Sequence, residues 1–449
     1  MLPNLLVEGG RLYAAKQLAA ATVLFQRAFL LSPADPNVLR RLAVVLAESG
    51  DLNSSATLLR WAARLTPFSA DVHSNRASLQ LRQKELEMAA VSASRAIALD
   101  PGRWGAYTNV AVANQSLALP EQALCYYERS LQLRPTGNDY PRVNIGQLLL
   151  SMGRFAEGWS QFARRFDVNT PHLPTRLPRL VRVDRASRVL LWGDQGVGDQ
   201  IMFSSMLNDW LARRVASTLR VDDRLVPLFS RSFPTLDVIG ESCQFDEAQY
   251  DAQLSLGDLG GFLRQTADDF LGHQGAFLSA DQDLVGKYGQ QLLRSGARLV
   301  VGVSWRSQNV DTGAKRSMSP TQLCDSLALP GITLVNLQYG KREQDDVADL
   351  MLDSGVDNTL DLDGLAAVIA ACDLVITIGN TTAHLAAALG RETWVLVPKA
   401  SGWRWMQQGS RTPWYESVEI FRQTSDNDWR EPLGEIRRRL VHKLEKPKS

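Results

Sequence analysis

The chain has 449 residues, room for roughly two to four domains, and its 49 Lys and Arg nearly balance its 48 Asp and Glu, for a formal net charge of +1. This balance gives no indication of a nucleic-acid or acidic-membrane partner. Hydrophobic residues make up 45% of the chain, which is ordinary for a globular protein.

Four prolines recur with a spacing of 34 residues in the first third of the chain: Pro33, Pro67, Pro101 and Pro135. Each follows an apolar helical run and ends it, because proline lacks the N–H that a continuing helix needs. A period of 34 residues is the length of a tetratricopeptide repeat, a helix–turn–helix unit that stacks on its neighbours. The spacing therefore predicts a helical superhelix that selects a macromolecular partner.

Small residues recur in register with these prolines. They lie five, twelve and twenty-four residues before each proline: Ala28, Ala62, Ala96, Ser130; Ala21, Ser55, Ala89, Ala123; and Gly9, Ala43, Ala77, Ala111. Small side chains at these points allow helices to approach closely. A fifth, degenerate unit with Gly146, Gly158 and Phe162 lacks the proline and is expected to cap the stack. We place the repeat domain at 1–166.

Three asparagines occupy one column of the repeats: Asn75, Asn109 and Asn144. All lie in the first helix of a repeat, which lines the concave surface. The column resembles the asparagine ladder of O-GlcNAc transferases, in which amides grip the backbone of a protein substrate. An amide offers a donor and an acceptor, so it can bind peptide without demanding a sequence. The other interpretation is that these side chains are solvated groove residues or local caps.

The sequence pattern changes from helical repeats to alternating strands and helices after a proline-containing linker at 167–186. The apolar run Arg188–Trp192 ends in a glycine-rich turn and continues into a predicted helix over Gln200–Arg213, which is the opening of a Rossmann-like unit. A second series follows, with strands predicted at Leu299–Ser304, Thr333–Leu337, Leu374–Ile378 and Thr393–Val397 and helices at Pro320–Leu329, Glu343–Leu352 and Leu365–Ala371. This alternation predicts two α/β lobes, 187–296 and 297–449, each with a parallel sheet and with a cleft between them.

The strongest candidate site in the second series is the segment from Gly379 to Gly390. It follows a strand and opens a helix, where free N–H groups and the helix dipole favour a phosphate. Thr381 and Thr382 can cap the helix and donate hydroxyl hydrogen bonds, and His384 lies within the first turn. The alternative is an ordinary Asn/Thr cap with an incidental histidine.

These residues carry a resemblance. The last two-thirds of the chain is similar to the two-lobed GT-B glycosyltransferases, on the heptosyltransferase side, and to their tetratricopeptide-containing members, which include flagellin glycosyltransferases. Five motifs carry it: Trp192–Phe203, Gly302–Arg306, Lys315–Ser317, Leu337-Gln338, and the Asn380–Gly390 helix followed by Trp403-Arg404-Trp405. One departure is Gly379, where relatives often carry an Asp five residues before the histidine.

The resemblance implies a transferase that moves a sugar from a nucleotide sugar to a hydroxyl of a protein acceptor. The C-terminal lobe would bind the donor, the N-terminal lobe the acceptor. The implied donor residues are Trp305, Arg306, Lys315, Arg316, Ser317, Gln338, Asn380, Thr381, Thr382 and His384. Lys315 and Arg316 could instead be exposed loop cations, Gln338 a structural amide, and Trp305 a plug at the lobe interface.

Such a transfer needs a general base, usually a carboxylate that faces the donor sugar. Asp199 closes the glycine-rich turn, and in the heptosyltransferase-like pattern the matching Gly-Asp supplies that base. A helix N-cap is its alternative role, and both can hold at once. Asp194 is a weaker second candidate for the base.

The remaining motifs argue against nucleotide-cofactor, NTPase and metal-dependent chemistry. The glycine-rich turn is neither a dinucleotide fingerprint nor a P-loop, which argues against an NAD enzyme and an NTPase. Asp361 and Asp363 form a D-x-D, yet we expect no metal and no cofactor, with helix N-termini and cations stabilising the leaving phosphate. The alternative functions are a repeat scaffold with an inactive nucleotide-sugar fold, or transfer to a glycan or lipid.

The location is predicted from the cysteines and the apolar runs. The four cysteines have no CxxC pairing and are expected to be buried residues in a reducing compartment: Cys125, Cys243, Cys324 and Cys372. The first residues lack a secretory pattern. The apolar stretch Leu365–Ile378 contains Asp373 and is too short to span a bilayer. We therefore expect a cytoplasmic protein.

Overall fold

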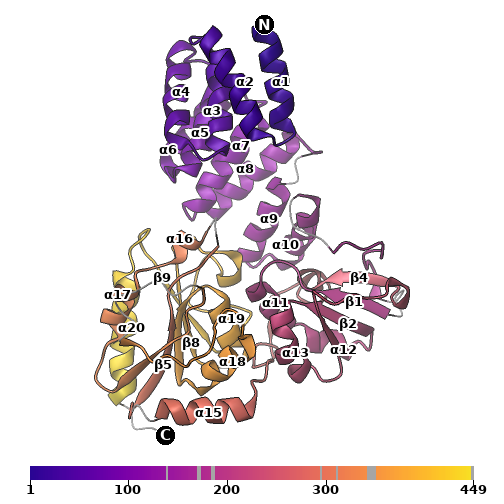
Figure 1. Cartoon of the computed structure of the whole chain (residues 1–449), viewed down its shortest axis with the longest axis vertical. Coiled ribbons are helices and arrows are strands. Elements are labelled where there is room, and N and C mark those ends of the chain that lie inside the picture. Colours follow the sequence, from indigo (N-terminus) through magenta and orange to yellow (C-terminus); the bar gives the residue numbers. More distant parts are fainter. Residues whose placement is uncertain are drawn as a thin grey trace. The chain divides into compact units, whose positions relative to one another are not determined.

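The computed structural model describes residues 1–137, 140–168, 173–183, 188–293, 296–309, 312–340 and 350–445. The chain forms two compact units, 1–148 and 149–449, which we call the repeat unit and the α/β unit. Figure 1 shows the helices of the first and the mixed helices and strands of the second. Among the described helices, none is both long enough and apolar enough to cross a membrane.

The repeat unit is a stack of paired helices, and from α1 to α8 each helix packs on the next along the chain. The even-numbered helices of the four pairs end two residues before the four periodic prolines, so the predicted stops are confirmed. The helices are α1 Leu2–Ala14, α2 Leu18–Leu31, α3 Pro36–Glu48, α4 Leu52–Leu65, α5 Ala70–Arg82, α6 Leu86–Leu99, α7 Trp104–Ser116, α8 Pro120–Leu133, and α9 Tyr140–Ser151, which runs across the unit boundary.

Small residues hold the helices of this stack close together. Ala28, Ala62 and Ala96 are fully buried at equivalent points of successive repeats. A Cβ added to Gly9 would lie 2.8 Å from a ring carbon of Phe25, so a larger residue there would push two helices apart. The predicted role of the small positions is confirmed.

The α/β unit contains two parallel sheets. The first has the strand order β3-β2-β1-β4 and the second β6-β5-β7-β8-β9, with parallel register throughout. The strands are β1 Arg188–Trp192, β2 Ala216–Val221, β3 Asp237–Gly240, β4 Ala252–Ser255, β5 Leu299–Ser304, β6 Ile332–Asn336, β7 Leu374–Ile378, β8 Thr393–Val397 and β9 Val418–Arg422.

Helices alternate with these strands, as predicted. They are α10 Phe155–Phe162, α11 Val197–Ser204, α12 Leu207–Ala212, α13 Val226–Ser232, α14 Gly260–Leu263, α15 Gln282–Leu293, α16 Gly313–Arg316, α17 Pro320–Leu327, α18 Leu362–Ala371, α19 Thr381–Ala388 and α20 Arg430–Glu445. The single helix predicted over Gln200–Arg213 is in fact two, α11 and α12. Most of the helix predicted at Glu343–Leu352 lies outside the described residues.

The second sheet is apolar on both faces, as expected of a parallel sheet covered on both sides. Val301, Val303 and Ile376 pack in one cluster with residues of α17 and α20. Val300, Val375 and Val395 belong to a larger cluster with α18 and α19. Figure 1 shows α17 and α20 together at one side of this sheet.

The second helix of the fifth pair belongs to the α/β unit, which corrects the predicted domain end at 166. The Trp159 ring of α10 packs edge-on against Trp403 and Trp414, and its Nε1 donates to the Arg264 carbonyl at 2.8 Å. A Cβ on Gly260 would lie 2.4 Å from the Trp159 ring. This helix is therefore part of an aromatic core and not an end cap of the repeats.

The regions around the two sheets pack directly on one another, where the sequence predicted a cleft. One continuous apolar cluster includes Phe203 of α11, Leu385 of α19 and Trp403. The boundary predicted at 296/297 is also displaced. The Phe277 and Leu278 N–H groups both donate to the Ala388 carbonyl at 3.0 Å, so the chain already contacts the second sheet's helices before α15 begins.

Candidate functional site

Two helix starts face one another in the α/β unit. Helix α11 begins just after β1, an inner strand of the first sheet, and α19 just after β7, an inner strand of the second. Carboxyl ends of parallel strands are where such sheets bind ligands. A Cβ on Gly198 would lie 3.1 Å from His384 Cδ2 and 3.4 Å from Thr381 Oγ1, so this glycine permits the close approach.

Asp199, the predicted base, has two partners in this contact. Its Oδ2 accepts a 3.4 Å hydrogen bond from the Gly196 N–H, and its Oδ1 accepts from Arg404 Nε in an ion pair. Gly196 is the N-cap of α11, and Asp199 is its third residue, so the carboxylate supplies one half of a capping box, whose other half a glycine cannot supply. Asp199 therefore caps the helix from its third residue and not, as predicted, from the N-cap position. The carboxylate also forms an ion pair with Arg404.

Arg404 is fixed by its neighbours. It lies in a single 3₁₀ turn, Trp403–Trp405, whose two tryptophans are buried. Its guanidinium carbon is 4.9 Å from the centre of the Trp403 ring, and its carbonyl accepts from Thr412 Oγ1 at 3.0 Å. The backbone of this cation is therefore well anchored, whereas its side chain reaches out to α11.

His384 is buried and cannot supply a positive charge to a phosphate at neutral pH. Burial lowers its pKa to about 3, reinforced by the charges of Arg404 and Arg316 and opposed by Asp199. Its Nδ1 forms a 2.9 Å hydrogen bond with the Tyr415 hydroxyl, and its ring stacks on Trp405 at 4.8 Å. The expected charge contact is thus replaced by a neutral packing role.

The buried His384 predicts an acid-sensitive fold. Because its pKa is lowered in the folded state, its contribution to stability is fully present above the unfolded pKa near 6.5 and is lost as the pH falls toward 3. Each pH unit in that window is worth about 1.4 kcal/mol. We expect urea unfolding to show His384→Gln losing less stability than wild type between pH 7 and pH 5. Equal pH slopes in the two proteins would refute this assignment.

The amides and hydroxyls predicted to hold the donor instead shape the loops beside α19. Asn380 caps the helix through its Oδ1 and donates to Ser304 Oγ at 2.6 Å. Gln338 Oε1 accepts from the N–H groups of Trp305 and Arg306 at 2.9 and 2.8 Å, which supports its structural alternative. Ser317 Oγ likewise accepts from the Ser307 N–H at 3.0 Å.

Burial distinguishes the remaining predicted donor residues. Trp305 is 3% exposed and belongs to the core between the second sheet and α17, so it neither stacks on a ligand surface nor plugs the lobe interface. Thr382 is fully buried. Thr381 is partly exposed at the start of α19 and is the hydroxyl best placed to contact a ligand.

The predicted cations lie on the second-sheet side of the site. Arg316 Nη1 donates to the Gly379 carbonyl at 2.9 Å, at the end of β7. Burial and then the charge of Arg404 lower the pKa of the Arg316 guanidinium, which shows how near the two cations are. Lys315 precedes Arg316 in α16 and is half-buried. A cation pair of this kind favours a bound anion.

Arg306 lines a hollow of about 800 Å³ next to the start of α19. Its other lining residues are Ser307, Gln308, Gly340, Asp357, Thr359 and Leu360. The Arg306 carbonyl accepts from Asn380 Nδ2 at 3.4 Å, so this hollow adjoins the helix cap. Its mixture of a cation, a carboxylate and hydroxyls suits a polar ligand.

Gly379 has a structural reason in this chain. A Cβ there would lie 2.4 Å from Trp405 Nε1, so the ring occupies the space that a side chain would need. The aspartate that relatives often carry at this position is incompatible with the packing of Trp405. The position of the Trp405 ring therefore requires a glycine at position 379.

Asp194 is excluded as the base. Its side chain is fully buried and accepts from Arg165 Nε at 2.8 Å and from the Gly257 N–H at 2.9 Å. Arg165 also pairs with Asp258 at 2.8 Å. This network ties the glycine-rich turn to the segment after α10, and no acceptor can reach it.

The asparagine column has internal partners at two of its three positions. Asn109 Nδ2 donates to the Ser74 carbonyl at 3.0 Å and so links α7 to α5. Asn144 Nδ2 donates to the Tyr127 hydroxyl at 3.1 Å. Within the described ranges, Asn75 Nδ2 alone of the three amide nitrogens is buried without a partner. Removing all three amides would therefore disturb stacking as well as any groove contact.

Two further features carry other roles. Asp361 caps α18 by accepting from the Gly364 N–H at 2.7 Å, and Asp363 pairs with Arg231, so each carboxylate of the D-x-D is bound by the protein.

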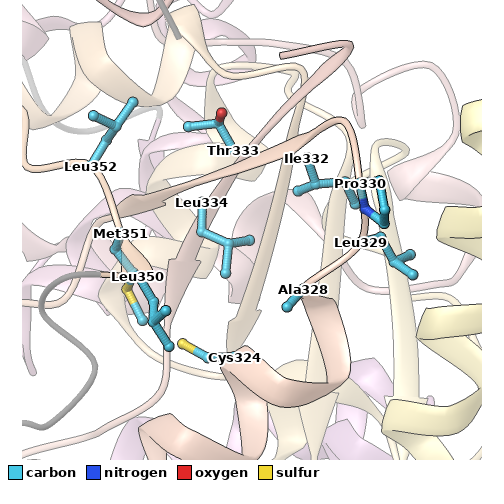
Figure 2. Close-up of a pocket in the computed structure, with 10 residues that line it drawn as sticks. All are labelled: Cys324, Ala328, Leu329, Pro330, Ile332, Thr333, Leu334, Leu350, Met351 and Leu352. Carbon is cyan, nitrogen blue, oxygen red and sulfur yellow. The ribbon is translucent and has the colours of Figure 1, made fainter. Parts of the chain in front are cut away.

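A hollow of about 500 Å³ beside β6 is apolar, with Leu334, Leu350 and Leu352 around it (Figure 2). Burial raises the pKa of its Cys324 thiol to about 11, which keeps the sulfur protonated.

Sequence reasoning missed Arg404 and Tyr415 as members of the site. The only signal was the Trp-Arg-Trp motif, because a cation flanked by two large aromatics has an anchored backbone. Its partner Asp199 is 205 residues away in the chain, and spacing alone does not identify such a pair.

Comparison with known proteins reveals a relative that covers most of this chain. No protein-family model matches the chain. Protein FlbA of Caulobacter vibrioides is 29% identical over 438 residues, covering 91% of this chain and 73% of FlbA. A match of that extent includes both units.

Solved structures match part of the chain. A thermophilic TPR protein of Thermus thermophilus is 25% identical, with a TM-score of 0.34, over 37% of this chain and 91% of its own. PilF of Pseudomonas aeruginosa is 16% identical, with a TM-score of 0.36, over 47% of this chain and 85% of its own.

Proposed function

We propose that this chain is a glycosyltransferase that moves a sugar from a nucleotide-sugar donor to a hydroxyl of a protein acceptor. The observation that carries the proposal is the ion pair of Asp199 with Arg404, with the charge of Arg316 nearby, between the starts of α11 and α19. A carboxylate base beside a cation pair is what sugar transfer to a hydroxyl requires.

The proposed reaction assigns a role to each side of this contact. Asp199 takes the proton of the acceptor hydroxyl while the hydroxyl oxygen bonds to the anomeric carbon of the donor sugar. The bond between that carbon and the donor phosphate breaks, and its electron pair leaves with the nucleotide. Arg316, Arg404 and the N–H groups at the start of α19 stabilise the new negative charge.

The hollow beside Arg306 supports the nucleotide part of the proposal. It adjoins the α19 cap, so a donor with its phosphates at Thr381 could place its nucleoside there. Asp357 and Thr359 offer carboxylate and hydroxyl partners for a ribose or base edge. The repeat unit would hold the acceptor protein, with flagellin as the acceptor that the resemblance suggests.

A thermal-shift screen with nucleotides and nucleotide sugars tests the donor site. A ligand that binds only the folded protein raises its melting temperature. We expect at least one nucleoside diphosphate or its sugar conjugate to stabilise the full chain, and Arg316→Gln to remove most of that shift. No stabilisation by any nucleotide would overturn the proposal.

One observation favours a second candidate, a repeat scaffold with an inactive nucleotide-sugar fold. The carboxylate of Asp199 is already engaged by Arg404, so the site as folded is closed to a hydroxyl. A scaffold would bind the partner protein through the repeats without releasing nucleotide. Donor-dependent nucleotide release separates the two functions.

A further inference from the structure

The carboxylate of Asp199 occupies a place suited to an anion. Arg404 Nε donates to it, and the charge of Arg316 acts on the same region. Within the described part of the chain, Arg316 Nε is buried without a hydrogen-bond partner, although its Nη1 is held by the Gly379 carbonyl. Arg404 therefore binds this carboxylate, and Arg316 adds a second positive charge beside it.

This arrangement conflicts with the proposed role of Asp199. The carboxylate oxygen that accepts from Arg404 is occupied and is not available to an acceptor hydroxyl. Proton transfer from an acceptor hydroxyl also needs the oxygen within hydrogen-bond reach. Asp199 can act only after Arg404 has released it.

A phosphate group resolves the conflict. Guanidinium groups bind phosphate oxygens through two parallel hydrogen bonds, and a diphosphate carries more charge than a single carboxylate. The same negative charge repels the carboxylate from the site. Trp403 and Trp405 anchor the backbone of Arg404, so the exchange requires only its side chain to turn.

We infer that Arg404 exchanges anions: it holds Asp199 in the unliganded protein and passes to the donor's diphosphate, which frees Asp199 to act as the base. The inference rests on the proposed function, because the diphosphate is that of the nucleotide sugar. It adds a dependence of the base on donor binding, so that the carboxylate is released only when a donor is present.

Competition between carboxylate and phosphate gives a direct test without turnover. Inorganic pyrophosphate is titrated calorimetrically into the full chain. We expect Asp199→Asn to bind pyrophosphate about tenfold more tightly than wild type, since its competitor for Arg404 is gone, and Arg404→Gln to bind at least tenfold more weakly. Asp222→Asn is the matched control, because Asp222 caps the turn after β2 and pairs with Arg224 at 2.7 Å. This control should bind within about twofold of wild type.

The double variant decides whether Arg404 mediates the effect. In the Arg404→Gln background, Asp199→Asn should no longer tighten binding, since the two residues act on one site. If Arg404→Gln does not fold, Arg404→Met, an unbranched side chain without a charge, takes its place in the cycle with the same expectation. Pyrophosphate affinity that is equal in wild type and Asp199→Asn overturns the exchange, even if the protein transfers sugar. The exchange stands if pyrophosphate behaves as expected while no nucleotide sugar binds, and only the proposed function then fails.

Discussion

Asp199→Asn is expected to lower sugar transfer by two to four orders of magnitude, the usual worth of general-base catalysis, while donor binding does not weaken. The amide is isosteric and can still accept from the Gly196 N–H, so the start of α11 stays capped. What it loses is the ability to take a proton. The measurement is kcat for nucleotide release at saturating donor and acceptor, with Asp222→Asn as a control for removing a capping carboxylate elsewhere.

The alternative role of Asp199 predicts a different pattern. A residue that only caps a helix and pairs with Arg404 would, on substitution, lower the melting temperature and leave kcat per folded molecule at the wild-type value. That pattern would remove Asp199 from the reaction.

Arg165→Leu is expected to destabilise the α/β unit by about 3–5 kcal/mol, because it leaves the buried Asp194 carboxylate without its cation. Arg165, Asp194 and Asp258 are all buried, and in the described part of the chain the Gly257 N–H is the one remaining hydrogen-bond donor to Asp194. Asp258 keeps its 2.8 Å pair with Arg179. Urea unfolding followed by tryptophan fluorescence reports on this unit, since all tryptophans except Trp61 and Trp104 lie in it.

A double variant isolates the charge from the packing of Arg165. Arg165→Leu combined with Asp194→Asn removes the uncompensated charge and should recover more than half of the lost stability. Burial already raises the pKa of Asp194, so the loss in Arg165→Leu should also be larger at pH 7 than at pH 5. If the double variant is no more stable than the single one, the loss arises from packing against Phe162 and Phe166 instead.

The repeats and the strands could be predicted from the sequence because their signals are local and periodic. Pro33 and its three equivalents end helices through the missing N–H, wherever the rest of the chain lies. The strands β1, β5, β7 and β8 are continuous apolar runs, which is the pattern of a sheet buried on both faces.

The limits of the domains were not predictable in the same way. The fifth helix pair has the repeat pattern in Gly158 and Phe162, yet Trp159 buries its ring among Trp403 and Trp414, which follow it by more than 240 residues. Periodicity describes the spacing of residues along the helix and not which surface covers them. A fragment that begins at 187 would therefore lose part of its own core.

The site was predicted in outline and not in its contacts. Asp199, Arg316 and Thr381 were recognised from helix starts and motifs, and the structure brings their elements together. The charge state of His384 could not be foreseen, because it depends on burial beneath Trp405 and Tyr415, which come later in the chain. Gln338 and Asn380 form their hydrogen bonds within the fold, and an isolated motif cannot distinguish such bonds from ligand contacts.

The most direct test of the central claim is the intact mass of an acceptor protein after incubation with the purified full chain and the nucleotide sugar that stabilises it. Flagellin from the source organism is the first acceptor to use. We expect the acceptor to gain the mass of one or more sugar residues and nucleotide to be released in the same amount, and we expect neither at a measurable rate with Asp199→Asn. An unchanged acceptor mass, with no nucleotide released although the donor binds, would contradict glycosyl transfer and leave the repeat scaffold as the function.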